Sequence, residues 1–402
     1  MPGAPKYPKI ALMTKAKTRR SAPSVVFLLA LAAIIGCGPF GNATNINAGA
    51  ALINAAEKGN LAQIKLLLAQ GANVNARDKF RLTALMDAAN ADIARVLIAR
   101  GANLNAQDEF GDTALTEAIH FGHANVARLL IARGANVNAR NNDGDTALIM
   151  DVNYGRADVA RLLVAHGANV NARDKDGDTA LMWVADAGIA RLFITRGANV
   201  NAQDNNGFTA LLDAAGNGYT DLVRLLVAHD ANVNARDNWG NTALLDAAYS
   251  GHADIARLLI AHGANVNARN KDGRTALMEA AERGHPDIVR LLITHGADVN
   301  ARDDKHRWTA LMWAATSVNA DVARLLIAHG ANVNARNKDG RTALMEAASS
   351  ANPDFARLLV THGADVNARA NNGATAASLT CTEWSAARSC PKQEILDALR
   401  GR

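Results

Sequence analysis

Histidines recur at one position of a repeating pattern and are the first candidates for metal chemistry. They end a short apolar, helix-like segment at six places: His166, His229, His262, His295, His329 and His362. Histidine is a common zinc ligand, but each ligand must lie about 2 Å from the ion. Packed helices lie about 8–10 Å apart, so histidines of successive repeats are too distant to share one ion. The position instead favours a structural role beside the negative end of a helix. We therefore expect no metal site.

A row of arginines is a candidate binding site for a polyanion. Its members are Arg95, Arg128, Arg161, Arg191, Arg224, Arg257, Arg290, Arg324 and Arg357. Seven of them follow an aspartate three residues earlier on the same helix face, which largely neutralises the row: Asp92, Asp158, Asp221, Asp254, Asp287, Asp321 and Asp354. The formal net charge of +5 includes six basic residues before residue 21, and 5 minus 6 leaves −1 for the remainder. A nucleic-acid binder needs a net basic footprint, so no nucleic-acid partner is expected.

Catalytic patterns are missing from the sequence. It contains no glycine-rich phosphate loop, no nucleophile elbow, and no paired carboxylates with a histidine base. Carboxylates recur because the repeat recurs. The sequence therefore predicts a protein that is not an enzyme and needs no cofactor.

The N-terminus has the pattern of an export signal. Basic residues precede the apolar segment Val25–Ile35, which is shorter than the roughly 20 residues that span a bilayer. The following Ile34-Ile35-Gly36-Cys37 tetrad resembles the lipobox of bacterial lipoproteins. That resemblance implies a signal peptide over residues 1–36, a lipid on Cys37 and a linker over residues 37–48. Ordinary cleavage and an uncleaved anchor or misread start are the alternatives, and Arg19-Arg20 fits a twin-arginine signal poorly.

Two further cysteines, Cys381 and Cys390, lie close together near the C-terminus. In an oxidising compartment two such thiols can form a disulfide, and we expect that they do. The alternative is a pair of packed thiols. Two cysteines alone cannot complete a tetrahedral zinc site.

A tandem repeat organises the rest of the chain. The tripeptide Thr-Ala-Leu begins at nine threonines with spacings of 30, 33, 33, 30, 33, 33, 34 and 33 residues: Thr83, Thr113, Thr146, Thr179, Thr209, Thr242, Thr275, Thr309 and Thr342. Each threonine is expected to cap a short helix, and a second amphipathic helix follows and ends at a glycine such as Gly263. An extended stretch with a turn then leads into the next unit. Such units cannot bury their apolar faces alone and must stack.

These units resemble ankyrin repeats. The family signature G-x-T-P-L-H-x-A-A with G-A-x-x-N-A corresponds here to GNTALLDAA at 240–248 and GANVNA at 263–268. The resemblance implies an all-α solenoid of about eleven helix-turn-helix units with β-hairpin tips, an array over 49–374 and a C-terminal capping repeat over 375–402.

The sequence departs from the family pattern at several positions. Alanine and mostly apolar residues replace the proline and histidine of the signature, so packing of Met278, Met312 and Met345 must substitute for a threonine–histidine hydrogen bond. The repeats at Thr83 and Thr179 lack three residues, close to one helical turn. Asp230 stands where other units have the helix-ending glycine.

The resemblance also implies a partner protein that lies against the tips and the exposed, concave side of the first helices. The first-helix row, four residues after each threonine, is Asp87, Glu117, Met150, Trp183, Asp213, Asp246, Glu279, Trp313 and Glu346. The pre-threonine row is Leu82, Asp112, Asp145, Asp178, Phe208, Asn241, Arg274, Trp308 and Arg341, and it changes from acidic to basic along the chain. Phe80, Phe110 and Trp239 add aromatic tips. Exposed tryptophan is a common interface anchor.

Function follows as an expectation from these features. The leading hypothesis is a monomeric, non-catalytic binding module, exported to the periplasm or cell surface, which contacts the membrane only through its lipid. A secreted effector or toxin-neutralising protein that acts on a foreign target is an alternative. A structural spacer is a second alternative, because the repeats are nearly identical. Residues 256–281 recur verbatim at 323–348, which indicates recent duplication.

Overall fold

The computed structural model describes residues 43–156, 158–317, 319–380 and 392–400. The chain divides into two units, Met1–Asn47 and Ala48–Arg402, and the second unit contains the repeats. Cys37, Cys381 and Cys390 lie outside the described residues. The lipid-attachment and disulfide predictions therefore stay predictions.

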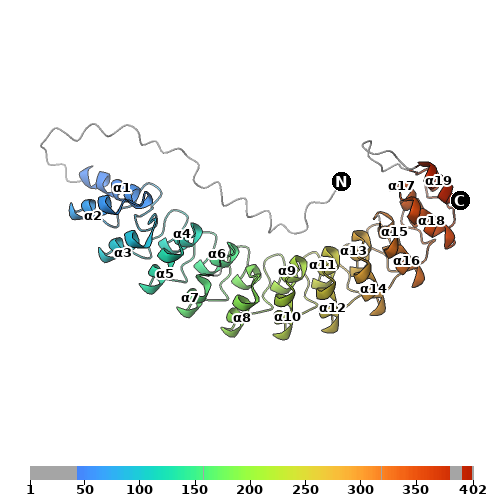
Figure 1. Ribbon diagram of the computed structural model, residues 1–402, viewed down its shortest axis with the longest axis horizontal. Helices are drawn as coiled ribbons and strands as arrows, with labels where there is room; N and C mark the ends of the chain where they lie inside the picture. Colours follow the sequence, from blue (N-terminus) through green and yellow to red (C-terminus); the bar gives the residue numbers. More distant parts are fainter. Residues whose placement is uncertain (1–42, 157, 318, 381–391, 401–402) are drawn as a thin grey trace. The chain divides into compact units, whose positions relative to one another are not determined.

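Short helices in pairs make up the second unit (Figure 1). They are α1 (Ala43–Glu57), α2 (Leu61–Ala69), α3 (Ala91–Ala99), α4 (Ala114–His120), α5 (Ala124–Ala132), α6 (Ala147–Asn153), α7 (Ala160–Ala165), the 3₁₀ helix η2 (Ala180–Trp183), α8 (Ala187–Thr195), α9 (Ala210–Asn217), α10 (Thr220–Ala228), α11 (Ala243–Ser250), α12 (Ala253–Ala261), α13 (Ala276–Arg283), α14 (Pro286–Thr294), α15 (Ala310–Ala315), α16 (Ala320–Ala328), α17 (Ala343–Ser349), α18 (Pro353–Thr361) and α19 (Lys392–Leu399). The first helices α9, α11, α13 and α15 lie side by side, and the second helices α10, α12, α14 and α16 form a parallel row. The helical solenoid expected from the sequence is confirmed. None of the described helices has the length and apolar composition that a transmembrane span requires.

The repeating threonine starts the first helix of most units. In α11 the Thr242 hydroxyl accepts the N–H of Leu245 at 3.4 Å, and in α9 Thr209 accepts that of Leu212 at 3.2 Å. This satisfies one of the backbone donors that a helix start leaves without an intrahelical partner. The capping role predicted from the sequence is confirmed at six threonines: Thr113, Thr146, Thr209, Thr242, Thr275 and Thr309. Thr342 at the start of α17 makes no such bond.

Small and aliphatic side chains fill the core between these layers. Alanine pairs such as Ala247 and Ala248 are fully buried, which lets neighbouring first helices approach closely. Met278, Met312 and Met345 are buried in the same core. Methionine is flexible enough to fill irregular gaps, so these three side chains supply the inter-repeat packing that the sequence predicted.

The two shortened repeats lose their first α-helix. Residues 84–87 form turns, and residues 180–183 form only η2. The buried hydroxyls of Thr83 and Thr179 have no hydrogen-bond partner among the described residues, which is also true of Thr342 at the start of the intact α17. Deleting about one helical turn therefore removes the helix that each threonine would cap, while the stack continues on both sides.

The repeat tips are turns rather than β-hairpins. Among the described residues there is no β-strand, and two isolated bridges, Arg140 with Thr146 and Arg173 with Thr179, are the nearest approach to one. A side chain closes each turn instead: the Asp237 carboxylate accepts the N–H groups of Trp239 at 2.9 Å and Asn241 at 2.7 Å. The expected hairpin strands are thus not confirmed, because the tip bonds to its own aspartate.

An asparagine ladder joins each tip to the next unit. The Asn234 side chain accepts the N–H of Asn265 at 2.8 Å and donates to the carbonyl of Gly263 at 3.0 Å. The same two bonds recur at Asn75, Asn138, Asn171, Asn201, Asn267, Asn300 and Asn334. A backbone bond of 2.8 Å from Lys271 N–H to the Trp239 carbonyl links the tips directly. The tips therefore form one continuous, hydrogen-bonded edge.

Asp230 holds the helix-ending position in the left-handed region, with φ at 61°. The bonds of the helix end are kept, since Ala231 N–H still donates to the Leu226 carbonyl at 3.0 Å. A side chain in this region carries a steric cost that glycine lacks. We expect Asp230→Gly to raise the free energy of unfolding by roughly 0.5–1 kcal/mol, measured by urea denaturation. The reciprocal change Gly263→Asp, at the same position with φ at 85°, should lower it, and equal stability of both variants would contradict this explanation.

Candidate binding surface

The first-helix row is mostly buried. Glu117, Met150, Asp246, Glu279 and Glu346 are all buried, and Asp87, Trp183, Asp213 and Trp313 are half-buried. The exposure expected for this row from the resemblance is therefore wrong for the five buried members. In two repeats the reason is local, because the arginine before the threonine, Arg274 or Arg341, contacts the buried glutamate.

Arginine and glutamate from the two rows pair with each other. The Arg341 guanidinium donates to both Glu346 oxygens, at 2.9 and 2.7 Å, and Glu346 is only 2% exposed. In the identical upstream copy Arg274 pairs with Glu279 at 3.0 Å and also with Glu282. The pre-threonine row changes from acidic to basic along the chain, but its arginines are not unpaired charges. Arg274 and Arg341 neutralise buried glutamates of their own repeats.

Trp308 and Trp313 form a packed cluster rather than isolated anchors. Their rings lie 4.6 Å apart, and the Arg274 guanidinium lies over the Trp313 ring at 3.9 Å. The Trp313 indole N–H donates to Asp303 at 3.2 Å. Both tryptophans are half-buried against the core, so they hold neighbouring repeats together and expose only part of each ring.

The aromatic tips are the best exposed of the predicted residues. Trp239 is 50% exposed, and Phe80 and Phe110 are similarly open. Phe208 is buried behind Trp239, with ring centroids 5.7 Å apart. The Trp239 indole thus lies half exposed on the tip edge and packs against the buried Phe208 ring.

Acidic tips accompany these rings over three consecutive repeats. Burial and then the neighbouring Asp143 carboxylate raise the pKa of Asp145 to about 6. Burial also raises the pKa of Asp174 to about 6, with Asp178, Asp145 and Asp176 adding to the effect. Neither Asp145 nor Asp174 has an ion pair among the described residues. Asp143, Asp174 and Asp176 were not predicted from the sequence. The pattern that could have indicated this acidic cluster is the tip sequence N-N-D-G-D at 141–145, followed by D-K-D-G-D at 174–178.

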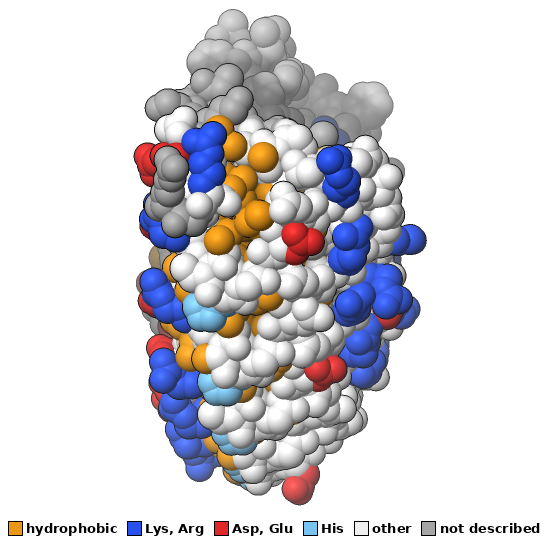
Figure 2. All heavy atoms as spheres, turned by 90° about the vertical axis from the view of Figure 1, so that its right-hand side faces the viewer, with side chains coloured by type: hydrophobic (Ala, Val, Ile, Leu, Met, Phe, Trp, Pro, Cys, Tyr) orange, Lys and Arg blue, Asp and Glu red, His pale blue; other side chains and the backbone are white. Residues whose placement is uncertain are grey.

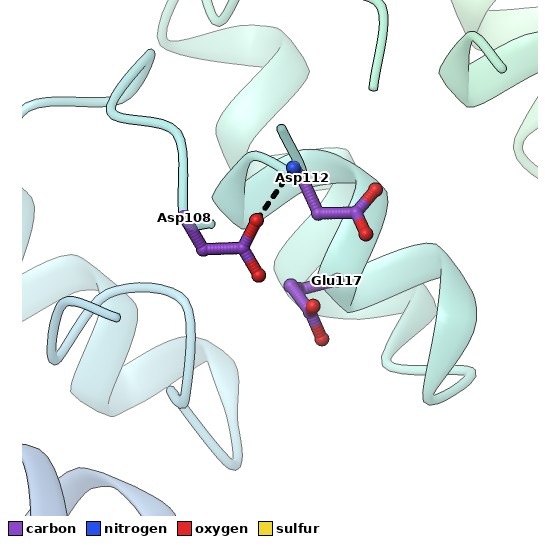
Figure 3. Close-up of side chains that lie close together, drawn as sticks. All are labelled: Asp108, Asp112 and Glu117. Atoms are coloured by element: carbon purple, nitrogen blue, oxygen red, sulfur yellow. Dashed lines mark hydrogen bonds between the residues drawn. The ribbon is translucent and has the colours of Figure 1, made fainter. Parts of the chain in front are cut away.

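Three buried carboxylates meet beneath the Phe110 tip (Figure 3). One oxygen of each of Asp108, Asp112 and Glu117 lies within 4.8 Å of the others. Asp108 accepts the N–H groups of Phe110 and Asp112, both at 2.8 Å, and the Asn141 amide donates to Asp112 at 3.0 Å. Through these bonds the Asp108 carboxylate closes the turn that carries Phe110, and the Asp112 carboxylate is bonded to the next tip. It is the sole group of possible metal ligands found among the described residues, and the prediction that the protein holds no metal stays a prediction.

The histidine row caps the second helices. His262 bonds to the Leu258 carbonyl at 2.8 Å through Nδ1, as His295, His329 and His362 do to the carbonyls four residues before them. Figure 2 shows histidines spaced along one side of the face it draws, next to a margin of lysine and arginine. Their spacing from unit to unit fits the structural role predicted for them.

The arginine row is paired where the structure shows its contacts. Arg95, Arg257, Arg324 and Arg357 each contact the aspartate three residues earlier. These pairs are exposed, and each contributes little to stability. They neutralise four of the seven arginines for which the sequence predicted an aspartate partner.

Comparison with known proteins agrees with this architecture. The family model for ankyrin repeats, which spans three copies, matches residues 12–108, 90–174, 170–237, 232–303 and 302–370. No curated protein matches the chain. The family matches cover most of the sequence, and the structure supplies the stacked helix pairs and linked tips that such repeats form. The chain belongs to the ankyrin repeat family.

Proposed function

We propose that this chain is a non-catalytic binding protein whose tip edge contacts another protein. Ankyrin repeats are generally protein–protein interaction modules and typically act as scaffolds without catalysis. The observation that carries the proposal is Trp239, an indole half exposed on a hydrogen-bonded edge and backed by Phe208. Aromatic side chains on a rigid support are the usual energetic anchors of protein interfaces.

The partner's contact region should combine apolar and basic side chains. Asp145 and Asp174 lie on the same edge as Phe110 and Trp239, and crowding and burial disfavour their charged forms. A lysine or arginine of the partner opposite Asp145 and Asp174 would favour the charged form of both carboxyl groups and set the orientation of the complex. Nucleic acid is not a proposed partner, because its phosphates would be repelled by these acids.

The tip edge is tested by comparing two exposed aromatic residues. Trp239→Ala should lower recovery of the main partner in affinity capture by about tenfold, because a half-exposed indole would be buried at the interface. Tyr219→Ala is the matched control, since Tyr219 is 41% exposed but precedes α10, in the turn between two helices. Equal recovery with both variants would place the interface elsewhere.

The proposal includes export and a lipid tether at Cys37. Its support is the sequence alone: the basic segment, Val25–Ile35, and the cysteine after Gly36. Replacing Cys37 with Ala should move the protein from the membrane pellet to the soluble fraction, measured by fractionation and immunoblotting. Retention in the pellet would remove the tether from the proposal, and wild-type protein found in the medium would favour the secreted alternative.

The mature N-terminus and the two C-terminal cysteines can be examined together. Mass spectrometry would identify the first residue, any lipid on Cys37, and a Cys381–Cys390 disulfide. We propose that the disulfide forms, because export places the thiols in an oxidising compartment. A monomeric state is part of the same proposal and is measured by light scattering.

A further inference from the structure

The first repeat of the array has an uncovered second helix. Leu66 in α2 is 57% exposed, whereas the equivalent Leu258 in α12 packs against the core. The difference arises because no helix pair within the described residues precedes α1 and α2. Terminal repeats normally carry polar residues on this outer face, so an exposed leucine here indicates a further contact.

The same repeat is also unusually basic. Residues 48–82 contain Lys58, Lys65, Arg77, Lys79 and Arg81 against Glu57 and Asp78, which gives 5 minus 2, or +3. All five cations are exposed, and none forms an ion pair among the described residues. Residues 37–402 together have a net charge of −1, so the remaining repeats are net acidic.

Lys65 shows how this charge arises. It occupies the position of Arg257 in the arginine row, but Ala62 stands where Asp254 neutralises Arg257. Lys65 therefore has no ion pair among the described residues and directly precedes the exposed Leu66. Exposed lysines near a protruding aliphatic side chain are suited to an anionic lipid surface.

We infer that this basic end of the array, formed by Lys58, Lys65 and Leu66 with the first tip, docks on an anionic phospholipid bilayer. The inference rests on the proposed export and tether, because Cys37 lies only six residues before α1 begins at Ala43. A covalent link of that length reaches at most roughly 20 Å, whatever its conformation. The lipid and the basic end would then act as two weak membrane signals whose combination gives stable attachment.

The experiment uses the chain from Gly38 to Arg402, which keeps every described residue and the whole core but has no cysteine to lipidate at its start. Its binding to phosphatidylglycerol–phosphatidylcholine vesicles is compared with binding to pure phosphatidylcholine vesicles by co-sedimentation. We expect preference for the anionic vesicles, weakened by salt. Lys58→Glu with Lys65→Glu should reduce that binding roughly tenfold or more, and Leu66→Ser should reduce it as well.

Arg257→Glu with Arg290→Glu is the control, since it makes the same change of charge in later repeats. Equal binding to both vesicle types, or equal losses in the two charge variants, would overturn the inference. Thermal unfolding of each variant identifies any loss that comes from misfolding. The vesicle result does not depend on lipidation, because the chain used lacks Cys37. If Cys37 carries no lipid, the proposed tether is wrong, but the measured vesicle binding is unchanged.

Discussion

Replacing Asp151 with Asn should stabilise the array at about pH 8 by roughly 2–3 kcal/mol and leave its stability near pH 4 unchanged. Asp151 lies in α6 and is 1% exposed. Burial is the main reason that its pKa rises from 3.8 to about 7, although the N–H groups of Ala160 and Val159 and the charge of Arg156 act in the opposite direction.

The direction of the pH effect follows from linkage. Between pH 3.8 and about 7 the folded state holds a proton on Asp151 that the unfolded state has released. The stability that protonated Asp151 contributes is therefore fully present below pH 3.8 and is lost as the pH rises through the folded pKa of about 7. A change from 3.8 to about 7 corresponds to roughly 4 kcal/mol at most. Asparagine removes this loss and keeps an oxygen that can accept the N–H groups at the start of α7.

Asp151→Ala separates charge from hydrogen bonding. Alanine also removes the titration, but it leaves the N–H groups of Val159 and Ala160 without their acceptor, which costs about 1 kcal/mol each. We expect this variant to exceed wild type at about pH 8 and to fall below it near pH 4. Urea denaturation across pH measures both curves. Parallel curves for wild type and Asp151→Asn would show that the carboxyl group is not the cause.

Asp145 and Asp174 contribute to the same decline in wild type, since the pKa of each is raised to about 6. Their effect is common to wild type and both Asp151 variants. The comparison between variants therefore isolates Asp151.

The repeat architecture was predictable because its signals are local. A threonine cap, an apolar helix face and a left-handed helix end each depend on residues within a few positions, as at Thr242 and Gly263. The tandem copies then fix the neighbours, so stacking follows from one unit. The three residues missing at Thr83 and Thr179 indicated the loss of about one helical turn, but the loss of the whole first α-helix in these repeats was not predicted.

The binding surface was less predictable because exposure depends on neighbouring segments. Glu279 and Glu346 were expected on an exposed face, yet the arginine five residues earlier folds over each of them. Asp151 was missed altogether, although a signal was present: seven of the eight equivalent positions are alanine, namely Ala88, Ala118, Ala214, Ala247, Ala280, Ala314 and Ala347. A charged residue at a core position of an otherwise regular array marks a local exception that only the three-dimensional environment explains.

The duplicated segments allow a second large effect to be tested within one molecule. Residues 256–281 and 323–348 have the same sequence, but their neighbours differ. Arg274 contacts Glu282 and lies over the Trp313 ring in addition to pairing with Glu279. Ser349 stands at the position equivalent to Glu282, so Arg341 lacks that second carboxylate.

Glu346→Ala should therefore destabilise the protein more than Glu279→Ala. Removing a carboxylate that is 2% exposed leaves the half-buried Arg341 without its bidentate partner, and we expect a cost of about 3 kcal/mol. Glu279→Ala should cost about 1–2 kcal/mol, since Glu282 and the Trp313 ring still stabilise Arg274. Urea denaturation followed by circular dichroism measures both variants.

A double variant tests whether the pair or the glutamate alone is responsible. Arg341→Met with Glu346→Leu removes both charges and keeps apolar volume, so it should recover most of the stability lost in Glu346→Ala. Equal costs for Glu279→Ala and Glu346→Ala would mean that the neighbouring repeats do not alter the pair. Unequal costs in two identical sequences would show instead that each repeat's charges are balanced by residues outside the duplicated segment, which is how copies of one unit come to differ along the array.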